Sequence, residues 1–320
     1  MPEGGKMDWK VYYRAEIARP EGRDAIVDFL ETGGDPKVEG AIGRGAIVSF
    51  PHTALSYAGP LQARLVSAIY RPGIDRIVAL GVLHGIGIEA FRTARDPSLP
   101  PNERKAAFKE VAGGFSLPAD TYDTPFGGYP VWRPADDGPI RIDRSGILGS
   151  EFSLDTFASI LKLGADLFGE EEIPIFPVYV GMTSDPIEGG FDLAFNLAKW
   201  LRGIVRPGTA LVTTGDLVHY GTAYAGPGEP VEDDPSLTGR FRSKVERMLD
   251  SGLIEGDLDG AYRMGTEVLK SDQREILPVI GAYLGGEGSY EIIEFDLSDY
   301  AGILDVDPPC RVASALIIYG

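Results

Sequence analysis

The apolar positions of the chain fall into short continuous runs separated by segments with helical periodicity. The continuous runs predict buried strands at residues 46–50, 76–82, 173–180, 210–214, 290–295 and 311–319. The helical patterns cover residues 22–31, 60–69, 154–168, 191–203, 235–251 and 257–268, the last running on toward 274–284. This alternation predicts an α/β fold, a mixed sheet with flanking helices, which we expect to form a single domain over residues 1–320.

One long segment interrupts the alternation. Residues 97–143 contain clusters of Pro, Gly and Asp together with Trp132 and several tyrosines. The segment is too long for a plain connection and too aromatic for a linker. We therefore expect a lid or a pocket wall there.

Composition and charge narrow the class of protein. The chain has 320 residues, of which 43% are hydrophobic, and this is enough for a large core. It has no run of about 18 apolar residues and no apolar segment behind its N-terminus, so we expect a cytoplasmic protein without a membrane span or signal peptide. The formal net charge of −18 argues against nucleic acid as a partner.

The three histidines of the chain share one sequence context. His52, His84 and His219 each end a strand-like run inside a short motif that contains Gly or Pro. Ligands gather where the carboxyl ends of strands leave an open α/β sheet. Because histidine is the commonest neutral metal ligand, the pattern predicts one shared metal site. A histidine in such a motif, taken singly, is more often an ordinary loop or core residue than a ligand, and the prediction rests on all three sharing one context.

Two further residue types limit the chemistry. Cys310 is the only cysteine, which leaves His with Asp or Glu as the available metal ligands. Asp216 precedes His219 by three residues, so a helical turn after the strand would place both on one face. Such a neighbour would raise the pKa of the imidazole and suit it to general acid–base catalysis. A helix cap is the other interpretation of Asp216.

These segments, in this order, resemble the Memo family, which shares its fold with the class III extradiol ring-cleaving dioxygenases. The similar stretches read PHTALSYAG at 51–59, GVLHG at 81–85, DTPFG at 123–127, EFSLD at 151–155, PVYVG at 177–181 and GDLVHYG at 215–221, and the closing strand at 311–319 is similar too. Each stretch is a weak motif, whereas the ordered set spans most of the chain and is more specific.

The resemblance implies a set of metal ligands. Memo proteins carry a metal-site cysteine where this chain reads DQREILPVIG at 272–281, and class III dioxygenases place a glutamate there. Glu275 is the natural counterpart, with Asp272 as the alternative. His52, His84 and Glu275 would then form a facial triad that leaves open positions on Fe(II), with Cu, Zn and Mn as alternative ions. A surface charge on a helix is the other interpretation of Glu275.

The resemblance also implies an activity. We expect a dioxygenase-like enzyme that opens a catechol-like or related hydroxylated ring with O2, in which His219, helped by Asp216, moves the proton of the substrate. Four aromatic residues are expected to line the pocket unless they belong to the core, namely Tyr57, Tyr122, Trp132 and Tyr220. Gly85 and Phe152 stand where the family has histidines, which weakens any inference about the substrate.

Two other functions stay open at this stage. One is a metal-binding protein without turnover, which recognises a partner or responds to redox state. The other is a hydrolase in which the ion activates water, and it would need no oxygen. A homo-oligomer is also left open.

Overall fold

The computed structural model describes residues 7–71, 73–85 and 88–320. Within them the strands are β1 Ile47–Phe50, β2 Arg76–Val82, β3 Gly114–Ser116, β4 Thr121–Thr124, β5 Gly127–Pro130, β6 Ile140–Ile142, β7 Ile175–Val180, β8 Thr209–Thr214, β9 His219–Gly221, β10 Tyr290–Asp299 and β11 Cys310–Tyr319. The main sheet has the order β10-β11-β1-β8-β2-β7-β3-β6, β9 pairs with β11, and β4 and β5 form a separate hairpin.

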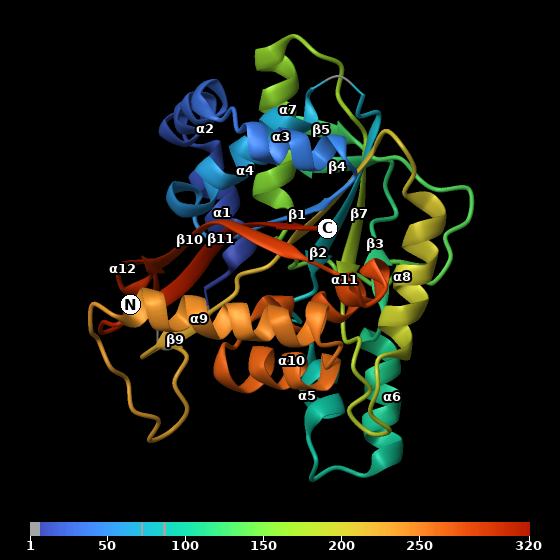
Figure 1. Ribbon diagram of the computed structural model, residues 1–320, viewed down its shortest axis with the longest axis vertical. Coiled ribbons are helices and arrows are strands. Elements are labelled where there is room, and N and C mark those ends of the chain that lie inside the picture. The colour runs from blue at the N-terminus through green and yellow to red at the C-terminus, as the bar shows by residue number, and fades with distance from the viewer. Residues whose placement is uncertain (1–6, 72, 86–87) are drawn as a thin grey trace.

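Helices cover both faces of the main sheet (Figure 1). They are α1 Trp9–Ala18, α2 Pro20–Thr32, α3 Pro36–Gly43, α4 Leu55–Ile69, α5 Glu89–Arg95, α6 Pro101–Val111, α7 Asp155–Phe168, α8 Asp192–Ile204, α9 Leu237–Leu249, α10 Leu258–Arg263, α11 Leu277–Leu284 and α12 Ala301–Leu304. Three shorter turns are η1 Asp250–Ile254, η2 Met264–Val268 and η3 Asp272–Arg274. This arrangement confirms the predicted α/β class with a mixed sheet and flanking helices. Among the described residues no helix is both long and apolar enough to span a bilayer.

Alternate residues of the central strands face two different helical layers. On β2, Ile77 and Ala79 pack into the core built with α2, α3, α4 and α7. Val78 and Leu80 pack into the core built with α8, α9 and α11. Because both faces are covered, these strands are continuous apolar runs in the sequence, without alternation.

Four neighbouring strands make the centre of the sheet parallel. β1 pairs with β8, and β2 pairs with β8 and β7, all in parallel register. Their carboxyl ends therefore lie at one edge of the sheet, the edge at which ligands bind in folds of this class. The residues that directly follow these strands include His52 after β1, His84 after β2 and Asp216 after β8.

The segment predicted as a lid or pocket wall has structure of its own. Residues 97–143 contain α6, the β4–β5 hairpin and the short strands β3 and β6. β3 pairs with β7 and β6 pairs with β3, so these two strands extend the main sheet at one end. The segment is therefore largely an extension of the sheet.

Candidate metal centre

His52 is held in one tautomer by the end of the neighbouring strand. Its Nδ1 lies 3.1 Å from Oγ1 of Thr214. The Thr214 hydroxyl donates its hydrogen to the Phe50 carbonyl at 2.9 Å, so its oxygen accepts from Nδ1–H of His52. Nε2 of the neutral His52 ring therefore carries a free lone pair. The side chain is only 3% exposed, so this lone pair faces the interior.

His84 is oriented in the same sense by a buried carboxylate. Its Nδ1 lies 3.1 and 3.2 Å from the two oxygens of Glu151, and its backbone N–H donates to Glu151 at 2.8 Å. Glu151 also accepts the backbone N–H groups of Phe152 and Ser153, each at 2.8 Å. The Phe152 ring stacks on the imidazole with centroids 4.5 Å apart. A carboxylate behind a histidine is the usual support of a metal-binding imidazole.

His219 completes the pattern from the other side. It lies in β9, and its Nδ1 donates to the Lys270 carbonyl at 2.8 Å. Lys270, which supplies this carbonyl, has a φ of 51°, in the left-handed region that a residue with a side chain rarely adopts. The third imidazole, like the other two, is thus bonded through Nδ1 and leaves Nε2 free.

The three free nitrogens converge on one carboxylate oxygen. Oδ2 of Asp272 lies 3.3 Å from Nε2 of His52, 3.6 Å from Nε2 of His84 and 3.8 Å from Nε2 of His219. Asp272 begins the turn η3, and its backbone N–H donates to the carbonyl of Asp216 at 2.9 Å. This bond ties η3 to the loop after β8 and so holds the carboxylate at the edge of the sheet.

The donor atoms fit a metal ion. His52, His84 and Asp272 each offer a ligand atom, and these atoms all lie within 4.8 Å of one another. Ligands bound to one ion at about 2.1 Å lie about 3.0–3.4 Å apart when their angles are octahedral or tetrahedral. The distance of 3.1 Å between Nε2 of His52 and Nε2 of His84 falls in this range. Imidazole and carboxylate donors suit divalent iron, manganese and zinc.

A second group of candidate ligands shares Asp272. It consists of Asp216, His219 and Asp272. The predicted helical turn from Asp216 to His219 is wrong, because residues 215–218 form an irregular loop between β8 and β9. Oδ1 of Asp216 instead accepts the backbone N–H of His52 at 3.1 Å, and Oδ2 lies 3.7 Å from Nε2 of His52. Asp216 therefore supports the position of His52 as well as lying beside His219.

The two aspartates differ in their electrostatic surroundings. Burial raises the pKa of Asp216 more than His52 lowers it. Burial also disfavours the ionised form of Asp272, but His219, His52 and His84 outweigh it and hold its pKa well below its usual range. For His84, burial acts against protonation, whereas Glu151 and Asp272 outweigh it and raise the pKa to about 10. Without a metal, Nε2 of His84 therefore carries a proton that faces Asp272 and His52, and a bound metal ion would take the place of this proton. Asp272 is thus the carboxylate that is ready to bind a cation.

Glu275 does not take part in this cluster, and the predicted ligand set is corrected accordingly. Its carboxylate accepts the backbone N–H of Thr183 at 2.7 Å, the hydroxyl of Tyr262 at 2.9 Å and Arg95 at 2.9 Å. Arg95 therefore balances the negative charge of Glu275, and the carboxylate does not face the histidines. The prediction of a surface charge fails too, because the residue is only 4% exposed. The structure brings Asp272, the alternative, to His52 and His84.

A cavity of about 240 Å³ opens beside the cluster. His52, His84, His219 and Asp272 all line it. Its walls are mostly aromatic or aliphatic, and they include Trp9, Tyr13, Phe152, Tyr224, Tyr300 and Leu304. Within the described ranges no residue of the segment 97–143 lines this cavity, so that segment is not its lid. Helix α1 takes the place at the wall that the sequence assigned to the longer segment.

The four aromatic residues predicted to line a pocket have other partners. Each donates to an acceptor outside this cavity, namely the Asp299 carbonyl for Tyr57, Oδ1 of Asp155 for Tyr122, the Ile77 carbonyl for Trp132 and the Glu232 carbonyl for Tyr220. None of the four lines the cavity at the histidines. The prediction is therefore corrected, because aromatic residues fill cores as readily as pockets.

Sequence reasoning also missed two contributors to the site. Glu151 lies in the stretch EFSLD at 151–155, and the sequence analysis predicts no role for it, although an acid next to an apolar run is a candidate for a buried partner of a histidine. Helix α1 was not predicted. Trp9 and Tyr13, which are four residues apart and would share a helical face, were the available signal.

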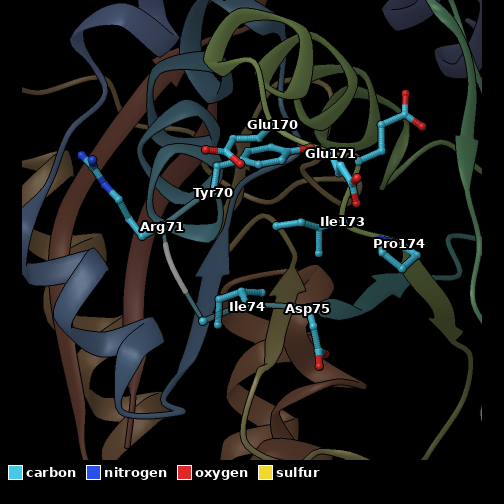
Figure 2. A pocket seen from close by; sticks show the side chains of 10 residues that line it. Tyr70, Arg71, Ile74, Asp75, Glu170, Glu171, Ile173 and Pro174 are labelled. Atoms are coloured by element: carbon cyan, nitrogen blue, oxygen red, sulfur yellow. The ribbon is translucent and has the colours of Figure 1, made fainter.

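A larger cavity, of about 540 Å³, lies near the opposite edge of the sheet (Figure 2). It is formed beside Ile74 and Asp75, which precede β2, and Ile173 and Pro174, which precede β7. Tyr70 also lines it, and its hydroxyl donates to the Leu161 carbonyl at 2.9 Å. Among its described lining residues there is no histidine. The candidate chemistry of the molecule therefore lies at the histidine cluster.

Comparisons with known proteins do not assign the chain to a family. A scan against protein-family models found no match, and a search of curated proteins found no similar sequence. The resemblance to the Memo family stays a prediction.

Proposed function

We propose that the protein is a non-haem metal-dependent enzyme of the ring-opening dioxygenase type, which acts on a small hydroxylated ring with O2. One observation carries the proposal. His52, His84 and His219 all donate Nδ1–H away from the cluster and turn Nε2 toward Oδ2 of Asp272. A set of two histidines, one carboxylate and a further histidine serves both to hold an ion and to move a proton.

His52, His84 and Asp272 are the residues that would hold the metal. Two histidines and one carboxylate bind Fe(II) on one face and leave other positions open. Bound Fe(II) would supply a site for the substrate oxygens and for O2. Thr214, behind His52, and Glu151, behind His84, fix the two imidazoles so that little reorientation is needed when an ion enters.

His219 is the proposed acid–base residue. Its Nδ1–H is used by the Lys270 carbonyl, so Nε2 is free to accept a proton, and the residue lines the cavity. A substrate hydroxyl in the cavity would transfer its proton to this nitrogen, which would hold it until the ring opens. Asp272 lies 3.8 Å from Nε2 of His219, and its negative charge stabilises the imidazolium that forms. A proton-transfer residue of this kind contributes about 10²–10⁴-fold to the rate.

A second candidate function rests on the group Asp216, His219 and Asp272. If an ion binds there as well, Asp272 bridges two metals, an arrangement common in enzymes that hydrolyse esters with two ions about 3.5–4 Å apart. His219 would then be a ligand and would not serve as a base. The number of metals per chain separates the two functions.

The test starts with purified protein stripped of metal and reloaded under anaerobic conditions with Fe(II), Mn(II) or Zn(II). Metal content is measured first, and oxygen uptake is then followed with catechol as the probe. The proposal predicts one ion per chain and oxygen uptake that requires both iron and catechol. One ion with no uptake for any hydroxylated ring tested would favour a metal-binding protein without turnover. Two ions with ester cleavage in the absence of oxygen would favour the hydrolase.

A further inference from the structure

We propose that the cavity beside the metal centre admits small uncharged hydroxylated rings and rejects aromatic carboxylates, and that the N-terminal helix α1 limits the size of the ring. The inference rests on the proposed function and specifies its substrate class. It follows from the size of the cavity, from the charges that surround it and from the way in which α1 is anchored.

The cavity is small. Its volume of about 240 Å³ lies below the range of about 300–1,000 Å³ that is typical of sites for drug-sized ligands. Trp9 and Tyr13 of α1 stack with centroids 5.5 Å apart, and Tyr13 contacts Phe152 with centroids 5.3 Å apart. Since Phe152 stacks on His84, these rings form one continuous wall from α1 to the metal ligands. A single ring fits such a space better than a branched or fused substrate.

The charges around the cavity favour an uncharged substrate. In the described part of the chain, none of its lining residues is Lys or Arg, whereas Asp216 and Asp272 both line it. Glu151 adds a third carboxylate directly behind His84. A carboxylate on a ring whose hydroxyl groups face the metal would point at walls that offer no Lys or Arg, and it would lose its hydration there, which is costly in a largely apolar space. A neutral ring that reaches the metal with its hydroxyl groups has no such penalty.

Helix α1 is fixed firmly enough to define the wall. Glu16 accepts the backbone N–H of Leu55 at 2.9 Å, and this bond ties α1 to the start of α4. Arg14 pairs with Asp123 at 2.8 Å, and this pair ties α1 to the β4–β5 hairpin. These anchors on both sides of the helix keep Trp9 and Tyr13 turned toward the cavity. The side chain of Val11 is exposed on the same helix and serves as a control position.

The test compares two probes on the Fe(II)-loaded protein under anaerobic conditions, catechol and 3,4-dihydroxybenzoate. Calorimetric titration at pH 7 gives both dissociation constants. We expect catechol to bind at least tenfold more tightly. Equal binding of the two would overturn the inference and leave the proposed function in place. Failure of both probes to bind would count against the proposed function itself.

A positive charge introduced at the cavity wall tests directly whether the lack of a cationic side chain excludes carboxylates. Ala223 lines the cavity and is exposed, so it tolerates a longer side chain. Ala223→Arg should raise the affinity for 3,4-dihydroxybenzoate at least tenfold, whereas the matched variant Ala223→Gln, which is long but uncharged, should not. If Ala223→Arg leaves that affinity unchanged, Leu304→Arg repeats the test from another wall, and failure of both overturns the role of charge.

The role of α1 is tested by removing one ring. Trp9→Ala should let the bulkier neutral probe 4-tert-butylcatechol bind at least tenfold more tightly than it binds the wild type. Val11→Ala, on the exposed side of the same helix, should change nothing. If Trp9→Ala and Val11→Ala give the same affinity for this probe, α1 does not set the size of the site.

Discussion

The Nε2 atoms of His52 and His84 lie 3.1 Å apart, while the Nδ1 atom of each ring is bonded on its far side. Two imidazole lone pairs at this distance repel each other unless a proton or a metal ion lies between them. Thr214 and Glu151 hold the rings in this relation, and Asp272 supplies a negative charge next to both. The pair is therefore a site prepared for a cation.

The His219→Ala variant separates acid–base chemistry from metal binding. We expect it to retain one metal per chain, because His52, His84 and Asp272 hold the ion. Its turnover should fall by about 10²–10⁴-fold, because no other free imidazole lines the described cavity to accept the proton. Metal analysis and oxygen uptake on the same sample check both parts. If the variant is purified without metal, His219 is a ligand and the two-ion arrangement gains support.

The Glu151→Gln variant tests the support behind His84. An amide keeps the size of the side chain but removes the charge that holds Nδ1–H of His84. Metal affinity should fall by about 10–100-fold, which is the usual effect of removing such a partner. Competition with a coloured chelator measures the affinity. Glu170→Gln, an exposed change near the opposite edge of the sheet, is the control, and an equal effect in both variants would remove Glu151 from the site.

The Glu275→Gln variant tests the correction to the ligand set. Glu275 holds Thr183, Tyr262 and Arg95 together, so its loss should lower the free energy of unfolding by about 1–3 kcal/mol. Metal content after loading should stay at one ion per chain. Chemical denaturation and metal analysis give the two values. Loss of the metal at unchanged stability would restore Glu275 as a ligand.

Six strands of the main sheet, β1, β2, β7, β8, β10 and β11, and the convergence of the histidines could be predicted from the sequence because both depend on local patterns. Continuous apolar runs identify strands that are buried on both faces, and β2 has the predicted bounds of residues 76–82. His52 and His84 follow two strands of a parallel sheet, whose carboxyl ends share one edge. Their meeting therefore follows from topology alone.

The third ligand and the cavity walls could not be predicted because they depend on contacts between distant segments. Asp272 begins the short 3-10 turn η3 and Glu275 directly follows it, so the turn is too short for any periodicity to tell which of the two faces the histidines. The partners of Glu275 come from α5, α10 and the segment that follows β7. In the same way, the rings of α1 reach the cavity only because the helix is anchored to α4 and to the β4–β5 hairpin.

Asp155 gives the protein a dependence of stability on pH that is separate from the metal centre. It is buried, and burial raises its pKa to about 6 despite the hydrogen bond from Tyr122. Because the pKa is higher in the folded protein than the ordinary 3.8, the group contributes stability below about pH 4 that is lost as the pH rises to about 6.

The Asp155→Asn variant should remove this contribution. The difference in unfolding free energy between pH 4 and pH 7 should change by about 2 kcal/mol relative to the wild type, with the variant losing less stability as the pH rises. Urea denaturation at several pH values measures it. Asp24→Asn, a change at an exposed carboxylate of α2, should leave the wild-type pH profile intact. An identical profile in Asp155→Asn would mean that Asp155 titrates normally.

The central claim is that His52, His84 and Asp272 bind one metal ion. The most direct measurement is the metal content of the wild type, Asp272→Ala and Glu275→Gln after anaerobic loading with Fe(II) and removal of free metal. The predicted result is one ion per chain in the wild type and in Glu275→Gln, and almost none in Asp272→Ala. A full ion in folded Asp272→Ala, or no stable binding by the wild type, would contradict the claim.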